Sequence, residues 1–230
     1  MKTEIIPAIL PMDYTEVEEK ISLVKDFVKT VQIDVCDGQF TPNPTWPYRK
    51  DDDMFGKILK EEEGFPGWEK LNFEIDLMVN KPEEIVDEWV AAGATRIIIH
   101  IEAKGDIAAA VEKLLGRVEV ALALNIDTPM SKIQDSRFRI QEEGGVQSVQ
   151  LMGIDRVGFQ GQEFDAKVID KIKEVRALYP DIAISVDGGV SLENAAQLYD
   201  AGATRLVVGS GIFGADNYLE ALQQLKAVGR

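Results

Sequence analysis

Three aspartates at the ends of short apolar runs are the residues of this sequence best suited to chemistry. Asp34 lies in VQIDVCD, Asp76 in LNFEIDLMV, and Asp187 ends DIAISVD. If these runs are parallel strands of one barrel, their ends meet at one mouth, and we expect the three carboxylates to converge there. Carboxylates act as general acids and bases, and their oxygens bind hard divalent cations.

Three glycine clusters follow the last three apolar runs, in VGFQGQ, DGGV and VVGSGIF. Glycine lets the backbone approach a ligand closely, so that N–H groups can converge on an anion. One cluster alone would indicate an ordinary turn, but three in successive loops favour a phosphate site. The predicted phosphate-binding residues are Gly158, Gly161, Gly188, Gly189, Gly209 and Ser210.

The alternation of side chains along the second run predicts which of them face the barrel interior. Gln32, Asp34 and Cys36 share one face, and Val35 belongs to the other. If Val35 packs against helices, Asp34 points into the barrel. Cys36 is predicted to be a small buried hydrophobe, and His100, the sole histidine, a hydrogen-bonded structural group without a catalytic role.

Apolar runs alternate with segments of helical period along the chain, the pattern of a parallel sheet covered by helices. AGATR occurs at 92–96 and again at 201–205, as either two half-barrels or the shared chemistry of helix-to-strand loops would produce. The fold class predicted is α/β, a single (β/α)8 TIM barrel of the ribulose-phosphate-binding type over residues 1–230. Its strands are expected at 4–10, 31–37, 71–79, 95–102, 118–125, 146–153, 181–187 and 204–210.

Capping residues predict where several helices begin. Asp13 and Ser191 are suited to the N-cap, and Pro82 to a first helical turn. Two irregular stretches, 38–70 and 126–145, interrupt the pattern. The first is either a lid over the active face or a solvated excursion with one helical turn.

Composition excludes several classes of protein. The net charge of −15, without a basic stripe, argues against nucleic-acid and membrane partners. The single cysteine and an N-terminus without signal-peptide features predict a cytoplasmic protein. Because no Walker or zinc-type motif is present, we expect no organic cofactor. A homo-oligomer is compatible with these features.

The sequence resembles the ribulose-phosphate 3-epimerase family from IIPAIL near the start to VVGSGIF near the end. The most specific matches are QIDVCDGQFTPN (32–43), DLMV (76–79), HIEA (100–103), GFQGQEF (158–164) and VDGGV (186–190). The resemblance implies a metal-assisted proton transfer at the carbon next to a ketone. It assigns the roles of base and acid, on opposite faces of the substrate, to Asp34 and Asp187.

The chain departs from the family pattern at the catalytic mouth. Ala8 replaces a serine, Gln32 and Asp76 replace two metal-binding histidines, and Gln160 stands where the sixth loop has glycine. The candidate metal ligands in this sequence are therefore Asp34, Asp76, Asp187 and Gln32. These ligands offer only oxygen, so a divalent metal should be Mg2+ or Mn2+ rather than Zn2+.

Two functions follow from this pattern. The first is an epimerase or isomerase acting on a ketose phosphate such as D-ribulose 5-phosphate, with Asp34 and Asp187 transferring the proton. The alternative is a catalytically degenerate barrel that binds a phosphorylated metabolite without turnover, as the replacements at Ala8, Gln32 and Asp76 would predict. A lyase resembling hexulose-phosphate synthase lacks support, because no lysine lies between Asp34 and Asp37.

Overall fold

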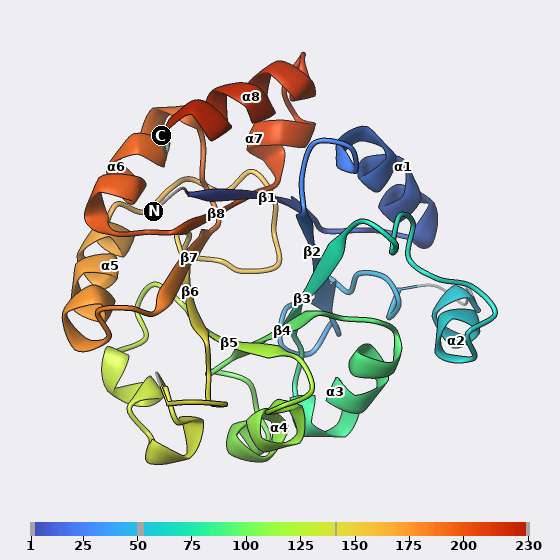
Figure 1. The fold of residues 1–230 in the computed structure, drawn as a ribbon, viewed down its shortest axis with the longest axis horizontal. Helices are drawn as coiled ribbons and strands as arrows, with labels where there is room; N and C mark the ends of the chain where they lie inside the picture. Colours follow the sequence, from blue (N-terminus) through green and yellow to red (C-terminus); the bar gives the residue numbers. More distant parts are fainter. Residues whose placement is uncertain (1–2, 50–52, 141, 229–230) are drawn as a thin grey trace.

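Eight parallel strands form a closed barrel in the computed structural model, which describes residues 3–49, 53–140 and 142–228. Strands adjacent in sequence are adjacent in the sheet, and β8 pairs with β1 to close the ring (Figure 1). The predicted (β/α)8 barrel is therefore confirmed. Its strands are β1 (Glu4–Ile9), β2 (Thr30–Cys36), β3 (Asn72–Met78), β4 (Arg96–His100), β5 (Glu119–Leu124), β6 (Ser148–Met152), β7 (Ala183–Asp187) and β8 (Arg205–Val208).

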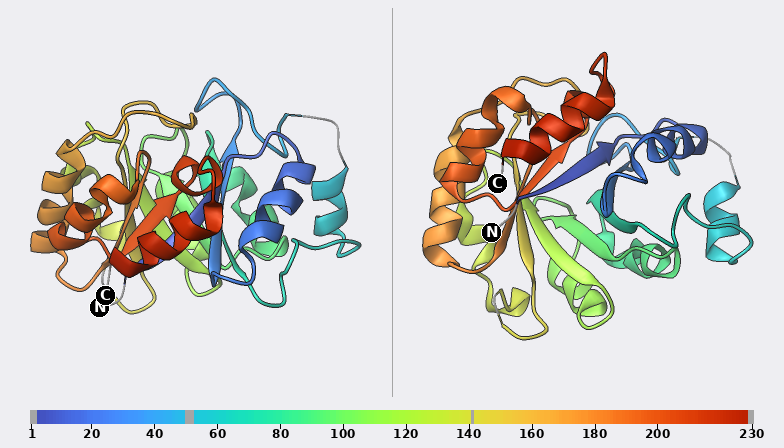
Figure 2. Two further views of the ribbon diagram at one scale, coloured as in Figure 1. Left: turned by 90° about the horizontal axis from the view of Figure 1, so that it is seen from above. Right: turned by 45° about the horizontal axis from the view of Figure 1, so that its top comes forward.

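Helices surround the barrel, and the views agree that the chain enters β1 and leaves the last helix at the same end (Figure 2). Two 3₁₀ helices, η1 (Met130–Ile133) and η2 (Ser136–Phe138), follow β5. None of the helices in the described residues is long and apolar enough to cross a membrane. The α-helices are α1 (Tyr14–Val24), α2 (Met54–Leu59), α3 (Pro82–Ala91), α4 (Ile107–Leu114), α5 (Lys167–Leu178), α6 (Leu192–Ala201), α7 (Ser210–Phe213) and α8 (Tyr218–Val228).

The local signals in the sequence mark where the helices begin. Asp13 is the N-cap of α1 and accepts a hydrogen bond from the N–H of Glu16 at 3.1 Å, while Ser191 is the N-cap of α6. Pro82 begins α3, as predicted. The strand predicted at 204–210 is shorter than expected: β8 ends at Val208, Gly209 is the N-cap of α7, and Ser210 begins that helix.

Outward-facing strand residues pack against the helices and form the main hydrophobic core. Val35 is fully buried there, and this confirms the orientation predicted for β2. Two separate apolar clusters lie inside the barrel: Ile6 with Ala8 and Val207, and Ile98 with Ala121 and Ala123. Between them the interior is polar, because Gln32, Asp76, Glu74, Gln150 and Asp187 are all buried.

The long stretch 38–70 contains the one helical turn expected there, α2, and is partly exposed and partly packed where the structure describes it. Trp46 and Phe65 are buried, and the Trp46 ring lies 5.2 Å from Tyr14, 5.7 Å from Phe55 and 6.2 Å from Trp89, centroid to centroid. This part of the stretch therefore packs onto the outside of the barrel between α1 and α3, whereas the Phe40 ring lies 5.1 Å from that of His100, centroid to centroid. Parts of the predicted domain and of both irregular stretches, namely 1–2, 50–52, 141 and 229–230, lie outside the described residues.

A network of ionic side chains fills the barrel at the end where the strands begin. Glu74 of β3, almost fully buried, accepts hydrogen bonds from Arg96 at 2.7 Å and from Arg205 of β8. Arg205 also lies 3.5 Å from Glu4, and its side chain is 6% exposed. Burial outweighs the charge and hydrogen bond of Arg96 and raises the pKa of Glu74 to about 8.

Candidate active site

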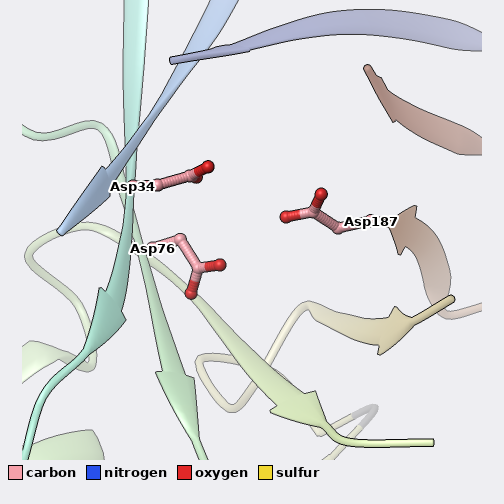
Figure 3. Close-up of side chains that lie close together, drawn as sticks. All are labelled: Asp34, Asp76 and Asp187. Atoms are coloured by element: carbon pink, nitrogen blue, oxygen red, sulfur yellow. The ribbon is translucent and has the colours of Figure 1, made fainter. Parts of the chain in front are cut away.

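The three predicted carboxylates converge inside the barrel near its mouth. Asp34 and Asp76 are register partners on the neighbouring strands β2 and β3, and Asp187 ends β7 on the opposite side. Figure 3 shows all three side chains directed toward the space between them. One carboxylate oxygen from each lies within 4.8 Å of the others. The convergence expected from the strand ends is therefore observed.

Two buried amides hold the carboxylates together. Gln32 donates from Nε2 to Asp34 Oδ1 and to Asp187 Oδ2, both at 2.7 Å. Gln150 of β6 donates from Nε2 to Asp76 Oδ2 at 3.1 Å and to Asp187 Oδ2 at 3.2 Å. Each amide thus bridges two carboxylates, and Asp187 is shared by both.

His100 is buried at the end of β4 and lies against this cluster. Its Nε2 is 3.1 Å from Asp76 Oδ1, and its Nδ1 is 3.8 Å from Glu102 Oε2. Burial disfavours the imidazolium, but the charge and hydrogen bond of Asp76, together with Glu102, outweigh it and raise the pKa of His100 to about 10. A positive charge beside Asp76 offsets part of the negative charge of the cluster. The hydrogen-bonded position expected for His100 is observed.

The two aspartates that face each other across the barrel have raised pKa values. Burial raises the pKa of Asp34 well above its usual range, and the charges of Asp187 and Asp76 add to this effect. Burial, followed by the charge of Asp76, raises the pKa of Asp187 to about 7. Carboxyl groups of this kind can hold and release a proton near neutral pH, as general acid–base catalysis requires.

The Cys36 thiol is fully buried, and burial raises its pKa to about 12, so it is not a nucleophile.

A pocket open to solvent lies at the mouth of the barrel. Asp34 and Asp187 line it, and Met78 and Met152 contribute apolar surface. Gly188 and Gly189 adopt φ values of 95° and 68°, which favour glycine. The pocket is also lined by all six predicted phosphate ligands, Gly158, Gly161, Gly188, Gly189, Gly209 and Ser210. The structure brings them together, and their binding of an anion stays a prediction.

The donor atoms around the aspartates fit a hard divalent cation. Asp34, Asp76 and Asp187 supply converging carboxylate oxygens, and the Oε1 atom of buried Gln32 has no hydrogen-bond partner among the described residues. No thiolate belongs to the group, and the imidazole of His100 lies against Asp76 rather than among the converging oxygens. Carboxylate and amide oxygens suit Mg2+ or Mn2+, whereas tight Zn2+ sites use nitrogen or sulfur.

Comparison with known proteins gives a family for this arrangement. The model of the ribulose-phosphate 3 epimerase family matches residues 4–213. The chain is 31% identical to a ribulose-phosphate 3-epimerase of Aquifex aeolicus, covering 96% of this chain and 95% of the relative. It is 29% identical to the Bacillus subtilis enzyme, covering 97% and 98%. The chain belongs to the ribulose-phosphate 3-epimerase family.

Solved structures outside the epimerase family share the fold at lower identity. A 3-hexulose-6-phosphate synthase has a TM-score of 0.66 at 20% identity, covering 99% of this chain and all of the other. A crystal structure of KGPDC from Streptococcus mutans has a TM-score of 0.70 at 14% identity, covering 99% and 97%. These likenesses support the barrel architecture alone.

One residue of the site was missed by reasoning from sequence, and another, Gln160, was noted only as a departure from the family pattern. Gln150 lies outside every motif that resembles the epimerase family, yet its amide contacts two of the three aspartates. The alternation of β6 carried a signal, because Ser148 and Gln150 are polar residues at alternate positions of an apolar strand. Gln160 lines the pocket, and its Nε2 lies 3.8 Å from where a methyl group on Gly209 would be.

Proposed function

We propose that the chain is a carbohydrate-phosphate epimerase that acts on a ketose phosphate such as D-ribulose 5-phosphate. The observation that carries the proposal is the pair Asp34 and Asp187, which face one pocket from opposite sides of the barrel. Family membership supports the same reaction. The chain also covers nearly the whole length of relatives named ribulose-phosphate 3-epimerase.

The reaction requires a base and an acid on the two faces of one carbon. One aspartate removes the proton from the carbon next to the ketone and leaves an enediolate. The other, protonated, returns a proton to the opposite face and inverts the carbon. Because the pKa of Asp187 is about 7 and that of Asp34 is also raised, one can be ionised while the other is protonated.

Groups around the two buried aspartates would stabilise the negative charge of the enediolate. When bound by Asp34, Asp76, Asp187 and Gln32, a divalent cation would supply positive charge that stabilises the enediolate. Gln32 keeps Asp34 and Asp187 at fixed positions through its 2.7 Å hydrogen bonds. Met78 and Met152 line the same pocket, and their apolar side chains would reduce the access of water to a bound substrate.

The phosphate of the substrate is assigned to the glycine-lined part of the pocket. Backbone N–H groups there can bind an anion without a basic side chain, which suits a chain with a net charge of −15. A structural neighbour with the same barrel architecture is named for a sugar phosphate, 3-hexulose-6-phosphate. A pentose phosphate bound in this orientation would direct its ketone end toward Asp34 and Asp187.

Solvent-proton exchange tests the proposed reaction. Incubation of the protein with D-ribulose 5-phosphate in D2O, with Mg2+ or Mn2+ present, should introduce deuterium at the carbon next to the ketone, as detected by NMR. Exchange reports proton removal even where net epimerisation is slow. The replacements of the family histidines by Gln32 and Asp76 favour the alternative of binding without turnover. Phosphosugar binding without exchange on any ketose phosphate would establish that alternative.

A methyl group at Gly209 should weaken binding of the phosphate. Gly209 has a negative φ of −92°, and its added Cβ would lie at an ordinary contact distance of 3.4 Å from Ala8 O, beside the pocket. We expect Gly209→Ala to weaken binding of D-ribulose 5-phosphate about tenfold by calorimetry, with an unfolding midpoint close to that of the parent. Gly64→Ala, at a glycine beside the exposed ring of Trp68, is the control. Equal affinities in both variants would contradict the phosphate assignment.

A further inference from the structure

The two amides at the carboxylate cluster share an unusual feature. Gln32 and Gln150 are 0% and 1% exposed, and each donates from Nε2 to two carboxylates. The carbonyl oxygens of the same amides, Oε1 in both residues, are buried without a hydrogen-bond partner in the part of the chain that the structure describes. Buried carbonyl oxygens are nearly always satisfied, so two orphaned ones beside one cluster call for a physical account.

Rotation of the terminal amide by half a turn exchanges the positions of its nitrogen and its oxygen. In this structure the Nε2 atom of each amide lies between two carboxylates. Its distances to the carboxylate oxygens are 2.7 Å for both contacts of Gln32, and 3.1 Å and 3.2 Å for those of Gln150. An N–H2 group suits carboxylates that have no cation between them. Once a cation binds, an oxygen atom is favoured at the same position, because Mg2+ and Mn2+ prefer oxygen ligands.

We propose that Gln150 is a cation ligand and that Gln150 and Gln32 form an amide switch. In the cation-free protein their N–H2 groups hold the three carboxylates together. With Mg2+ or Mn2+ bound, both amides turn and present their orphaned Oε1 atoms to the ion. The inference deepens the proposed function, since it rests on a divalent cation at the same cluster.

A purely structural role for Gln150 predicts the opposite effect on cation binding. If its amide only bridges Asp76 and Asp187 in the cation-free state, its removal destabilises that state alone. The cation would then bind as tightly as before, or more tightly. If Oε1 is a ligand, removal takes a donor from the bound state, and the cation binds more weakly. The direction of the change in affinity therefore distinguishes the two roles.

The test uses Mn2+ alone as the probe, on the chelator-treated full chain. Electron paramagnetic resonance of free Mn2+ gives the dissociation constant for the parent and for Gln150→Leu. We expect about tenfold weaker binding in Gln150→Leu, and a smaller rise of the unfolding midpoint on adding Mn2+. Ser148→Ala is the matched control, because Ser148 lies two residues earlier on β6, is buried, and has a hydroxyl without a partner among the described residues. Its Mn2+ affinity should equal that of the parent.

Unchanged or tighter Mn2+ binding in Gln150→Leu would overturn the proposal, as would a parent that binds no Mn2+. If the leucine variant fails to fold, Gln150→Met repeats the test, since its unbranched side chain fills a similar volume without an oxygen donor. Neither measurement involves substrate. A protein that binds Mn2+ through Gln150 but exchanges no proton of D-ribulose 5-phosphate would refute the epimerase and leave the switch intact.

Discussion

Replacing either aspartate of the proposed proton-transfer pair should abolish exchange while leaving the barrel and its pocket in place. Asp34→Asn and Asp187→Asn keep the side-chain shape, but an amide cannot accept the substrate proton. Loss of a general acid or base commonly reduces the rate by roughly 10²- to 10⁴-fold, and we expect a loss of this size in each variant. Deuterium incorporation from D2O into D-ribulose 5-phosphate measures it.

A matched control for these variants lies on an adjoining loop. Asp155 follows β6 by three residues and is exposed, so Asp155→Asn should retain the parental exchange rate. Affinity for D-ribulose 5-phosphate should change little in all three variants, because the phosphate is assigned to the glycine-lined part of the pocket. Exchange within tenfold of the parent in either Asp34→Asn or Asp187→Asn would refute the two-aspartate mechanism.

The largest expected loss of stability comes from the ionic network at the other end of the barrel. Glu74→Leu removes the acceptor for Arg96 and Arg205, and among the described residues it leaves the buried guanidinium of Arg205 with only Glu4 as an acidic partner, at 3.5 Å. Removing one partner of a buried ion pair typically costs about 3–5 kcal/mol of unfolding free energy. We expect a loss in this range, measured by urea unfolding at neutral pH.

A substitution that keeps an acceptor oxygen at this position should cost less. Glu74→Gln can still accept hydrogen bonds from the two arginines, so we expect it to be milder than Glu74→Leu. Glu84 provides the control, because its pair with Lys81 is about 60% exposed on both sides. Exposed pairs contribute at most about 1 kcal/mol, so Glu84→Ala should have little effect. If Glu74→Leu lowers the unfolding free energy by less than about 1 kcal/mol, the network contributes no more than an exposed ion pair, and the prediction is wrong.

The sequence by itself determined the architecture and most of the pocket. The alternation of apolar runs with helical segments is a local feature of the sequence, and so are the caps at Asp13 and Ser191. The convergence of Asp34, Asp76 and Asp187 could also be predicted, because parallel strands of one barrel end at the same mouth. Glycines in successive loops indicated the surface that the structure assembles into one pocket.

Only the tertiary structure decided which polar side chains meet inside the barrel. Period two assigns Gln150 to the inner face of β6, but its partner Asp76 is 74 positions away, and Gln32 lies 155 positions from Asp187. Glu74 and Arg205 are likewise separated by 131 positions. Local pattern fixes the face on which a residue lies. Contacts across the barrel depend on how the closed sheet aligns strands distant in sequence, and that alignment depends on packing of the whole ring.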